Sequence, residues 1–290
     1  MENQNGHLSK TKPTLTGIFD LIKKSWQIYA KNIKNFSILI SILILPILFS
    51  WLFEFFSKKF FLGTDCIYLS WILQIINFLI SLAALVFTIW IQLGLLFLIK
   101  EREKFLDIKQ ILKMSWSKII PFLWIVFLSN FIAGGGFFLF IVPGIFLAVS
   151  FSFSNYFLVS ENLKGMEALL ASKQLIKGYW WKILWRNMVK GFLTLVIFGL
   201  VALVIDILIG KTAGDFLMPI VSFYLMPFLL IYDFLIFQEL KQIKVNIISE
   251  APKTSTKVKY ILIGLVGLTI SLIFGSILYK FLKTIPTPPF

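Results

Sequence analysis

The chain has 290 residues, of which 58% are hydrophobic and 14% charged, and its mean hydropathy is +0.88. Because soluble domains carry about a quarter charged residues, this composition excludes an ordinary soluble domain and predicts an integral membrane protein. The net charge of +14 does not indicate nucleic-acid binding, since the basic residues sit in separate segments that alternate with apolar runs.

Seven apolar runs are long enough to cross a hydrocarbon layer of about 30 Å, namely residues 36–53, 67–99, 119–142, 144–160, 191–210, 216–239 and 260–279. We therefore predict an all-α fold, a polytopic helical membrane protein with a six-helix domain plus one C-terminal helix. In chain order we expect a flexible N-terminal tail at 1–13, the six-helix membrane domain at 14–240, a cytoplasmic linker at 241–258, and the seventh transmembrane helix with a short tail at 259–290.

Three basic segments combine apolar residues at spacings of three and four with lysines on the opposite face: 14–35, 104–120 and 165–190. Helices of this kind lie in the plane of the lipid headgroups and are attracted by anionic lipids. The alternative is that the segments extend the spans, with tryptophans anchoring the ends. The lipid-surface candidates are Lys23, Lys24, Trp26, Lys173, Lys177, Trp180, Trp181 and Arg186.

Each of these basic segments is followed by two spans. Short similar stretches also recur, with SWQIYAKNI at Ser25, SWSKIIPFL at Ser115 and SKQLIKGYW at Ser172. The separations are unequal and the matches short. They suggest an internal repeat whose unit is a basic amphipathic segment followed by two spans.

The stretch IVPGIFLAVSFSFSNYFLVSE at 141–161 could be part of one broken span, two spans joined by a tight turn, or a β-strand. An isolated strand in lipid would leave its backbone groups unpaired. The segments outside the spans carry six, two, six, no, six, one, five and two basic residues in chain order. Only two spans joined at Pro143-Gly144 keep this alternation, and the positive-inside rule then places the N-terminus in the cytoplasm and the C-terminus outside.

Glycines mark the third and seventh spans. A Gly-Gly-Gly run lies at 134–136, and Gly264, Gly267 and Gly275 are spaced along the last span. Glycine in a transmembrane helix is associated with a kink or with the close approach of another helix. We expect one of these two roles for the run at 134–136, and a functional hinge is the alternative.

Two acidic residues lie inside spans, Asp206 near the outer end of the fifth and Asp233 near the inner end of the sixth. Intramembrane acids are costly and often functional, so Asp206 and Asp233 are the candidates of a transport hypothesis for a small molecule or a lipid. That hypothesis needs the two acids to meet in one cavity, with Pro219 and Pro227 breaking the sixth helix. The structural alternative is that each acid reaches the membrane surface or pairs with a nearby Lys or Tyr.

Catalytic and metal sites are not expected. The single histidine, His7, and the single cysteine, Cys66, exclude an internal disulfide and a His-based or multi-Cys metal cluster within one chain. The sequence contains no nucleophile-elbow, Walker-type or HExxH motif. We expect no enzymatic activity, no catalytic residue, no metal site and no cofactor, and a lipid-acting enzyme using membrane carboxylates ranks third among the hypotheses.

A resemblance to a known family rests on residues 142–184. They contain Pro143-Gly144 before a span, Glu161 at its inner end, and then Gly165, Ala168, Leu169, Ser172, Leu175, Gly178 and Trp181. Together with FDLIKKSWQIYAKN at 19–32, this pattern resembles the membrane domain of glycerophosphoryl diester phosphodiesterase-type proteins and of related uncharacterised bacterial multi-pass membrane proteins. The resemblance covers roughly residues 14–240 and implies a six-helix membrane domain of unassigned activity. It brings no catalytic residue, because the phosphodiesterase barrel of those proteins is a separate soluble domain.

The first hypothesis from the sequence is a non-enzymatic lipid- or membrane-associated module in the plasma (inner) membrane of a bacterium. Its expected partners are membrane lipids, anionic ones above all, and not nucleic acid. The sequence identifies no protein partner.

Overall fold

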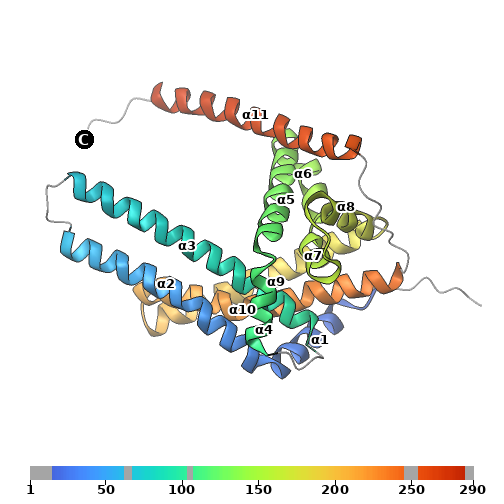
Figure 1. The fold of residues 1–290 in the computed structure, drawn as a ribbon, viewed down its shortest axis with the longest axis horizontal. Coiled ribbons are helices and arrows are strands. Elements are labelled where there is room, and N and C mark those ends of the chain that lie inside the picture. Colours follow the sequence, from blue (N-terminus) through green and yellow to red (C-terminus); the bar gives the residue numbers. More distant parts are fainter. Residues whose placement is uncertain (1–14, 62–66, 103–106, 245–253, 285–290) are drawn as a thin grey trace, which may run out of the picture.

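The structure, a computed structural model, describes residues 15–61, 67–102, 107–244 and 254–284, which are helical almost throughout and contain no strand (Figure 1). The helices are α1 (Ile18–Lys31), α2 (Ile33–Phe61), α3 (Ile67–Lys100), α4 (Ile108–Trp116), α5 (Ile119–Leu139), α6 (Ile141–Ser150), α7 (Ser154–Glu161), α8 (Gly165–Ile176), α9 (Trp180–Leu208), α10 (Lys211–Ile243) and α11 (Thr254–Thr284). The expected all-α fold is therefore confirmed. The tail expected at 1–13 lies outside the described residues.

Within the described ranges, seven stretches are long and apolar enough to cross a membrane: Ile33–Ser57, Trp71–Lys100, Ile119–Leu139, Ile141–Glu161, Trp180–Leu208, Leu217–Ile243 and Thr254–Phe281. They confirm the seven predicted spans. The fifth begins at Trp180 rather than at 191, so residues 180–190 extend a span, as the alternative for the basic segments proposed. The last begins at Thr254 rather than at 260, because the polar residues before Tyr260 continue the helix.

The turn between the third and fourth spans was predicted at Pro143-Gly144, but it lies at Phe140. Phe140 is extended (φ −160°, ψ 149°) and separates α5 from α6. Pro143 stands in the first turn of α6, where a missing N–H breaks no helical hydrogen bond. Gly144 instead permits close packing, because a Cβ there would lie 2.7 Å from the Cα of Phe137 on α5. The predicted helical hairpin is correct, and its turn is three residues earlier.

The fourth span is two helices, α6 and α7, rather than the single helix expected at 144–160. Between them, the Ser172 hydroxyl of α8 donates a hydrogen bond to the carbonyl of Ser150 (2.8 Å) and accepts one from the N–H of Phe153 (3.1 Å). A side chain from a neighbouring helix therefore satisfies backbone groups that the interruption frees.

The helices form three units, α1–α3, α4–α7 and α8–α10, each with one short helix followed by two spanning segments. The short helix of each unit packs against the last segment of the preceding unit: α4 against α3, α8 against α7, and α1 against α10. At each contact the serine of the sequence repeat, Ser25, Ser115 or Ser172, is fully buried. This cyclic arrangement gives the recurring serine a structural reason, since a small polar side chain fits where the short helix meets the bundle.

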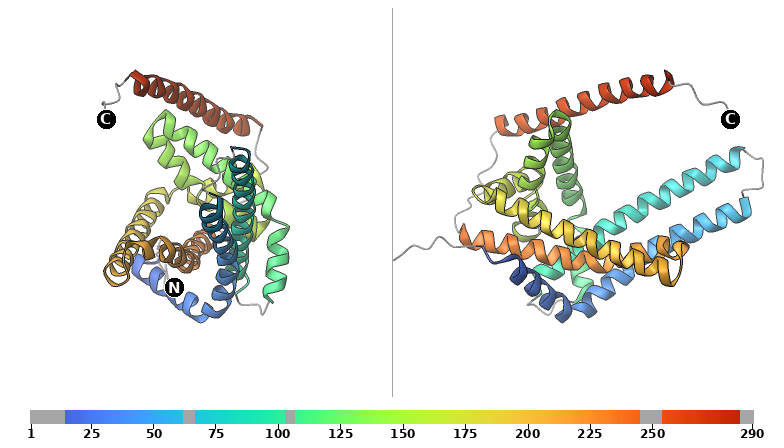
Figure 2. Two further views of the ribbon diagram at one scale, coloured as in Figure 1. Left: turned by 90° about the vertical axis from the view of Figure 1, so that its left-hand side faces the viewer. Right: turned by 180° about the vertical axis from the view of Figure 1, so that it is seen from behind.

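The three basic segments, which form α1, α4 and α8 with the start of α9, gather at one end of the bundle (Figure 1). We call this the basic end. There α10 is tied to α7 by the ion pair between Lys241 and Glu161, and to the chain just after α3 by a hydrogen bond from Arg102 to Gln238. Behind these contacts, aromatic side chains of α7 and α10 pack face to edge, with the rings of Phe157 and Phe237 5.1 Å apart. Figure 2 shows the hairpins extending from this end, α2/α3 and α9/α10 to one side and α5/α6 steeply across them.

The last helix, α11, crosses the tips of α5 and α6 (Figures 1 and 2). The crossing is built from glycines: a Cβ at Gly135 would lie 2.6 Å from the carbonyl oxygen of Ile263 and 2.7 Å from the Cα of Gly264. Gly267 faces Gly135 from the next turn of α11. The close approach predicted for the glycine run is thus confirmed, and Gly136 serves the α5/α6 contact instead.

Candidate functional site

Helix α1 has one buried face and one exposed face. Leu21, Ser25 and Tyr29 are buried against α10, and the Tyr29 hydroxyl donates a hydrogen bond to the Tyr224 carbonyl (3.1 Å). Burial, with a smaller effect from the Tyr224 phenol, raises the pKa of Tyr29 above its ordinary value, so the hydroxyl stays protonated as a donor. Lys23, Lys24 and Trp26 lie on the exposed side, where the Trp26 side chain is 59% exposed.

Helix α4 repeats this arrangement and was missed as a source of site residues. Ile111 and Ser115 are buried, whereas Lys109, Lys113 and Trp116 are exposed. The sequence signal was available, because Ser-Trp occurs at 25–26 and again at 115–116 after an apolar-x-Lys pattern. We call the exposed Lys23, Lys24 and Trp26 of α1 and the exposed Lys109, Lys113 and Trp116 of α4 the two basic faces.

The third basic segment does not form a comparable surface helix. In α8, residues on several sides are buried, and Lys173 donates to the Tyr260 hydroxyl of α11 with its ammonium 5.1 Å from the ring centre. The sequence candidate Lys173 is therefore engaged inside the fold. Lys177 is exposed beyond the end of α8, and its carbonyl accepts a hydrogen bond from Lys244 (2.6 Å).

The two tryptophans at the start of α9 differ in exposure. Trp180 is half-buried, its ring stacked on that of Phe146 at 5.4 Å, whereas Trp181 is 76% exposed. Only Trp181 keeps the surface position that the sequence predicted for both. An exposed tryptophan at the end of a span is typical of a membrane-interface anchor.

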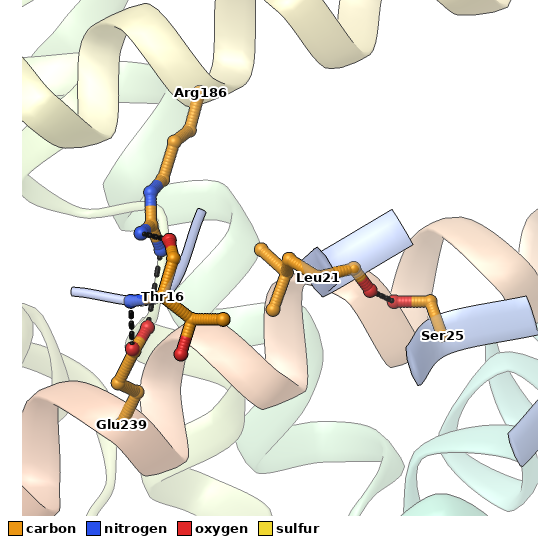
Figure 3. Close-up of polar contacts among 5 residues, drawn as sticks. All are labelled: Thr16, Leu21, Ser25, Arg186 and Glu239. Carbon is orange, nitrogen blue, oxygen red and sulfur yellow. Dashed lines mark hydrogen bonds and ion pairs between the residues drawn. The ribbon is translucent and has the colours of Figure 1, made fainter. Parts of the chain in front are cut away.

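Arg186, expected at the lipid surface, is buried, with 6% of its side chain exposed. Its Nη1 lies 3.1 Å from Oε2 of Glu239, and its Nη2 donates to the carbonyl of Thr16. The N–H of Thr16 in turn donates to Oε1 of Glu239, which closes a ring of three interactions (Figure 3). This clamp, formed by Thr16, Arg186 and Glu239, fixes the chain entering α1 to both α9 and α10.

The two intramembrane acids do not meet. Asp233 accepts hydrogen bonds from Lys190 at 2.7 Å on both carboxylate oxygens, which is the structural alternative considered for it. Asp206 is exposed near the far end of α9, ~24 Å from Lys190 at a rise of ~1.5 Å per residue. Helix α10 also runs through Pro219 and Pro227 without a break. The paired acids and broken helix required by the transport hypothesis are therefore not formed.

Two buried tyrosines of the span region provide a matched test of hydrogen bonding. The Tyr232 hydroxyl is buried without a partner among the described residues, whereas the Tyr156 hydroxyl donates to the carbonyl of Leu230 (3.2 Å). Tyr232→Phe is expected to leave the thermal midpoint in detergent unchanged or raise it, because it removes an unsatisfied polar atom. Tyr156→Phe is expected to lower the free energy of unfolding by about 1 kcal/mol, because it removes a satisfied hydrogen bond. Equal losses for both variants would contradict this account of Tyr232.

Among the described residues, no group of three His, Cys, Asp or Glu side chains could hold a metal ion. His7 and Cys66 lie outside the described residues. Comparisons with protein-family models, with curated proteins and with solved structures give no match. The resemblance to the phosphodiesterase-associated membrane domain therefore stays a prediction from the sequence.

Proposed function

We propose that the protein is a non-enzymatic module of a bacterial plasma membrane that binds anionic lipids of the cytoplasmic leaflet through its basic faces. The observation that carries this proposal is the matching exposure of α1 and α4. In both helices a buried serine anchors one side, and lysines followed by a tryptophan occupy the other. A fixed helix that presents lysine and tryptophan together suits the headgroup region, where the ring enters the boundary and the ammonium meets phosphate.

The lysines of the α1 basic face remain available for lipid, unlike two basic residues of α9. Arg186 and Lys190 are taken up by carboxylates of α10, whereas Lys23 and Lys24 form no ion pair with another described residue. Each lysine near an anionic membrane surface contributes about 1 kcal/mol. The proposed orientation, with the N-terminus in the cytoplasm, places both basic faces on the leaflet that carries the anionic surface potential.

Removing two charges from α1 tests the proposal. The double variant Lys23→Gln/Lys24→Gln is expected to lose about 2 kcal/mol, or roughly thirtyfold, in its preference for phosphatidylglycerol over phosphatidylcholine. The measurement is quantitative mass spectrometry of the lipids that remain with the purified full-length protein after reconstitution in mixed-lipid nanodiscs. High salt should reduce the preference of the wild-type protein, because the attraction is screened.

Lys280→Gln/Lys283→Gln is the matched control. It also removes two lysines, both exposed, but at the end of α11 away from the basic faces. The control should retain the wild-type preference. If both double variants lose the same amount of preference for phosphatidylglycerol, the effect reflects net charge alone and the proposed role of the basic faces is wrong.

A further inference from the structure

An apolar groove lies where α1 meets α9 and α10. Its volume is about 190 Å³, and its walls include Ile22 of α1, Leu193 and Ile197 of α9, and Leu225 and Leu229 of α10. An apolar cavity of ~150 Å³ is large enough to take up benzene, so this groove has room for a segment of hydrocarbon chain. It is far too narrow for another helix, whose diameter with side chains is about 10 Å.

The length of the fifth span puts the groove at the depth of the acyl chains of one leaflet. The fifth span, Trp180–Leu208, has 29 residues and is therefore ~43 Å long, more than the ~30 Å of a hydrocarbon layer. Counting ~20 residues back from Leu208 places Lys190 close to the boundary at the basic end. Leu193 and Ile197 then lie within the leaflet, where the medium around the protein is lipid chain and not water.

Unpaired positive charge lies on α1 beside the groove, although not among the residues that line it. Lys23 follows Ile22 directly and is exposed, with no ion pair to another described residue. Lys190, by contrast, is neutralised by Asp233. Trp26 closes the rim one turn further on, with its ring 6.4 Å from that of Phe228, which also lines the groove. An apolar groove beside an exposed ammonium matches a molecule with a hydrocarbon chain and an anionic head.

We propose that this groove binds one acyl chain of an anionic phospholipid, with the lipid phosphate beside Lys23. The inference rests on the proposed function and deepens it, since it assigns one lipid of the basic end to a defined position. Lys190, Thr194 and Tyr232 also line the groove, but the surface that they present to it is apolar, so the chain displaces no polar contact there. Helix α1, held in place by the clamp, supplies both the wall residue Ile22 and the headgroup ligand Lys23.

Photo-crosslinking of the full-length protein in nanodiscs tests this site. The probe is phosphatidylglycerol with a diazirine on one acyl chain, and the labelled peptides are identified by mass spectrometry. Label is expected on 190–197 and 225–232, and Leu193→Trp, which fills the groove, should abolish labelling of both. Leu195→Trp is the matched control, because Leu195 is on the same helix but faces outward at 72% exposure, and it should label as wild type.

The same experiment separates the groove from the basic faces. Lys23→Gln should weaken groove labelling by phosphatidylglycerol and leave labelling by the phosphatidylcholine probe unchanged. Uniform labelling along α9, or equal labelling of the two tryptophan variants, would overturn the groove. Equal groove labelling by a free fatty acid probe would overturn the assignment to a phospholipid. Groove labelling that depends on Leu193 but not on Lys23 would overturn the position of the phosphate beside Lys23, whereas the proposed function would fail only if Lys23→Gln/Lys24→Gln also kept the wild-type lipid preference.

Discussion

Replacement of Glu239 by glutamine is expected to lower the free energy of unfolding by about 3–5 kcal/mol, because the variant leaves the guanidinium of Arg186 buried without an opposing charge. The Arg186 side chain is 6% exposed and that of Glu239 17%, so water cannot take the place of the carboxylate. The same change weakens the hydrogen bond that Thr16 makes to Glu239 and loosens the entry to α1. Thermal or chemical unfolding in detergent measures the loss.

Glu161→Gln is the matched control for Glu239→Gln. Glu161 also pairs with a basic residue near the basic end, but the side chains of Glu161 and Lys241 are 31% and 38% exposed. Exposed pairs contribute about 0–1 kcal/mol, so this variant should be nearly as stable as the wild type. The double variant Arg186→Met/Glu239→Leu should recover most of the stability lost in Glu239→Gln, since it removes both charges. Equal small losses in both single variants would show that the clamp is not desolvated.

The sequence predicts the spans because their signal is local. About 20 consecutive apolar residues are needed wherever a helix crosses lipid, and the alternating basic counts decide between one span and two at 141–161. The same local logic predicts the exposed lysines and tryptophan of α1. It fails at Phe140, because a hairpin turn between apolar flanks needs no special residue, and Pro143 is equally suited to the first turn of the next helix.

The errors at Lys173 and Arg186 have a different origin. A basic residue on the polar face of an amphipathic segment has the same pattern whether it meets lipid headgroups or a partner from a distant part of the chain. Arg186 pairs with Glu239 and Lys173 with Tyr260, and neither partner is close in sequence. The same applies to the groove, since α1 and α9 are far apart in the chain. Tertiary contacts of this kind decide which basic residues remain available for lipid.

Substitution of Gly267 by leucine is expected to separate α11 from α5 and to lower stability by at least the ~1–3 kcal/mol typical of overpacking. At Gly267 a new side chain meets the backbone of Gly135 and not a flexible side chain, so no rotamer change can relieve the clash. Helix α11 must move as a whole, and its contacts through Tyr260 to Phe151 and Lys173 are lost with it. Thermal unfolding in detergent measures the cost.

Gly275→Leu is the control for Gly267→Leu on the same helix, because nothing lies within 4 Å of a Cβ added at Gly275. This substitution adds the same side chain and should even gain slightly from the higher helix propensity of leucine. Gly135→Leu, made on the opposite helix, should reproduce the loss seen with Gly267→Leu. The two losses should not add in the double variant, since either change alone opens the same crossing. Additive losses, or a loss of equal size at Gly275, would mean that α11 is not held by close packing of Gly267 on Gly135 of α5.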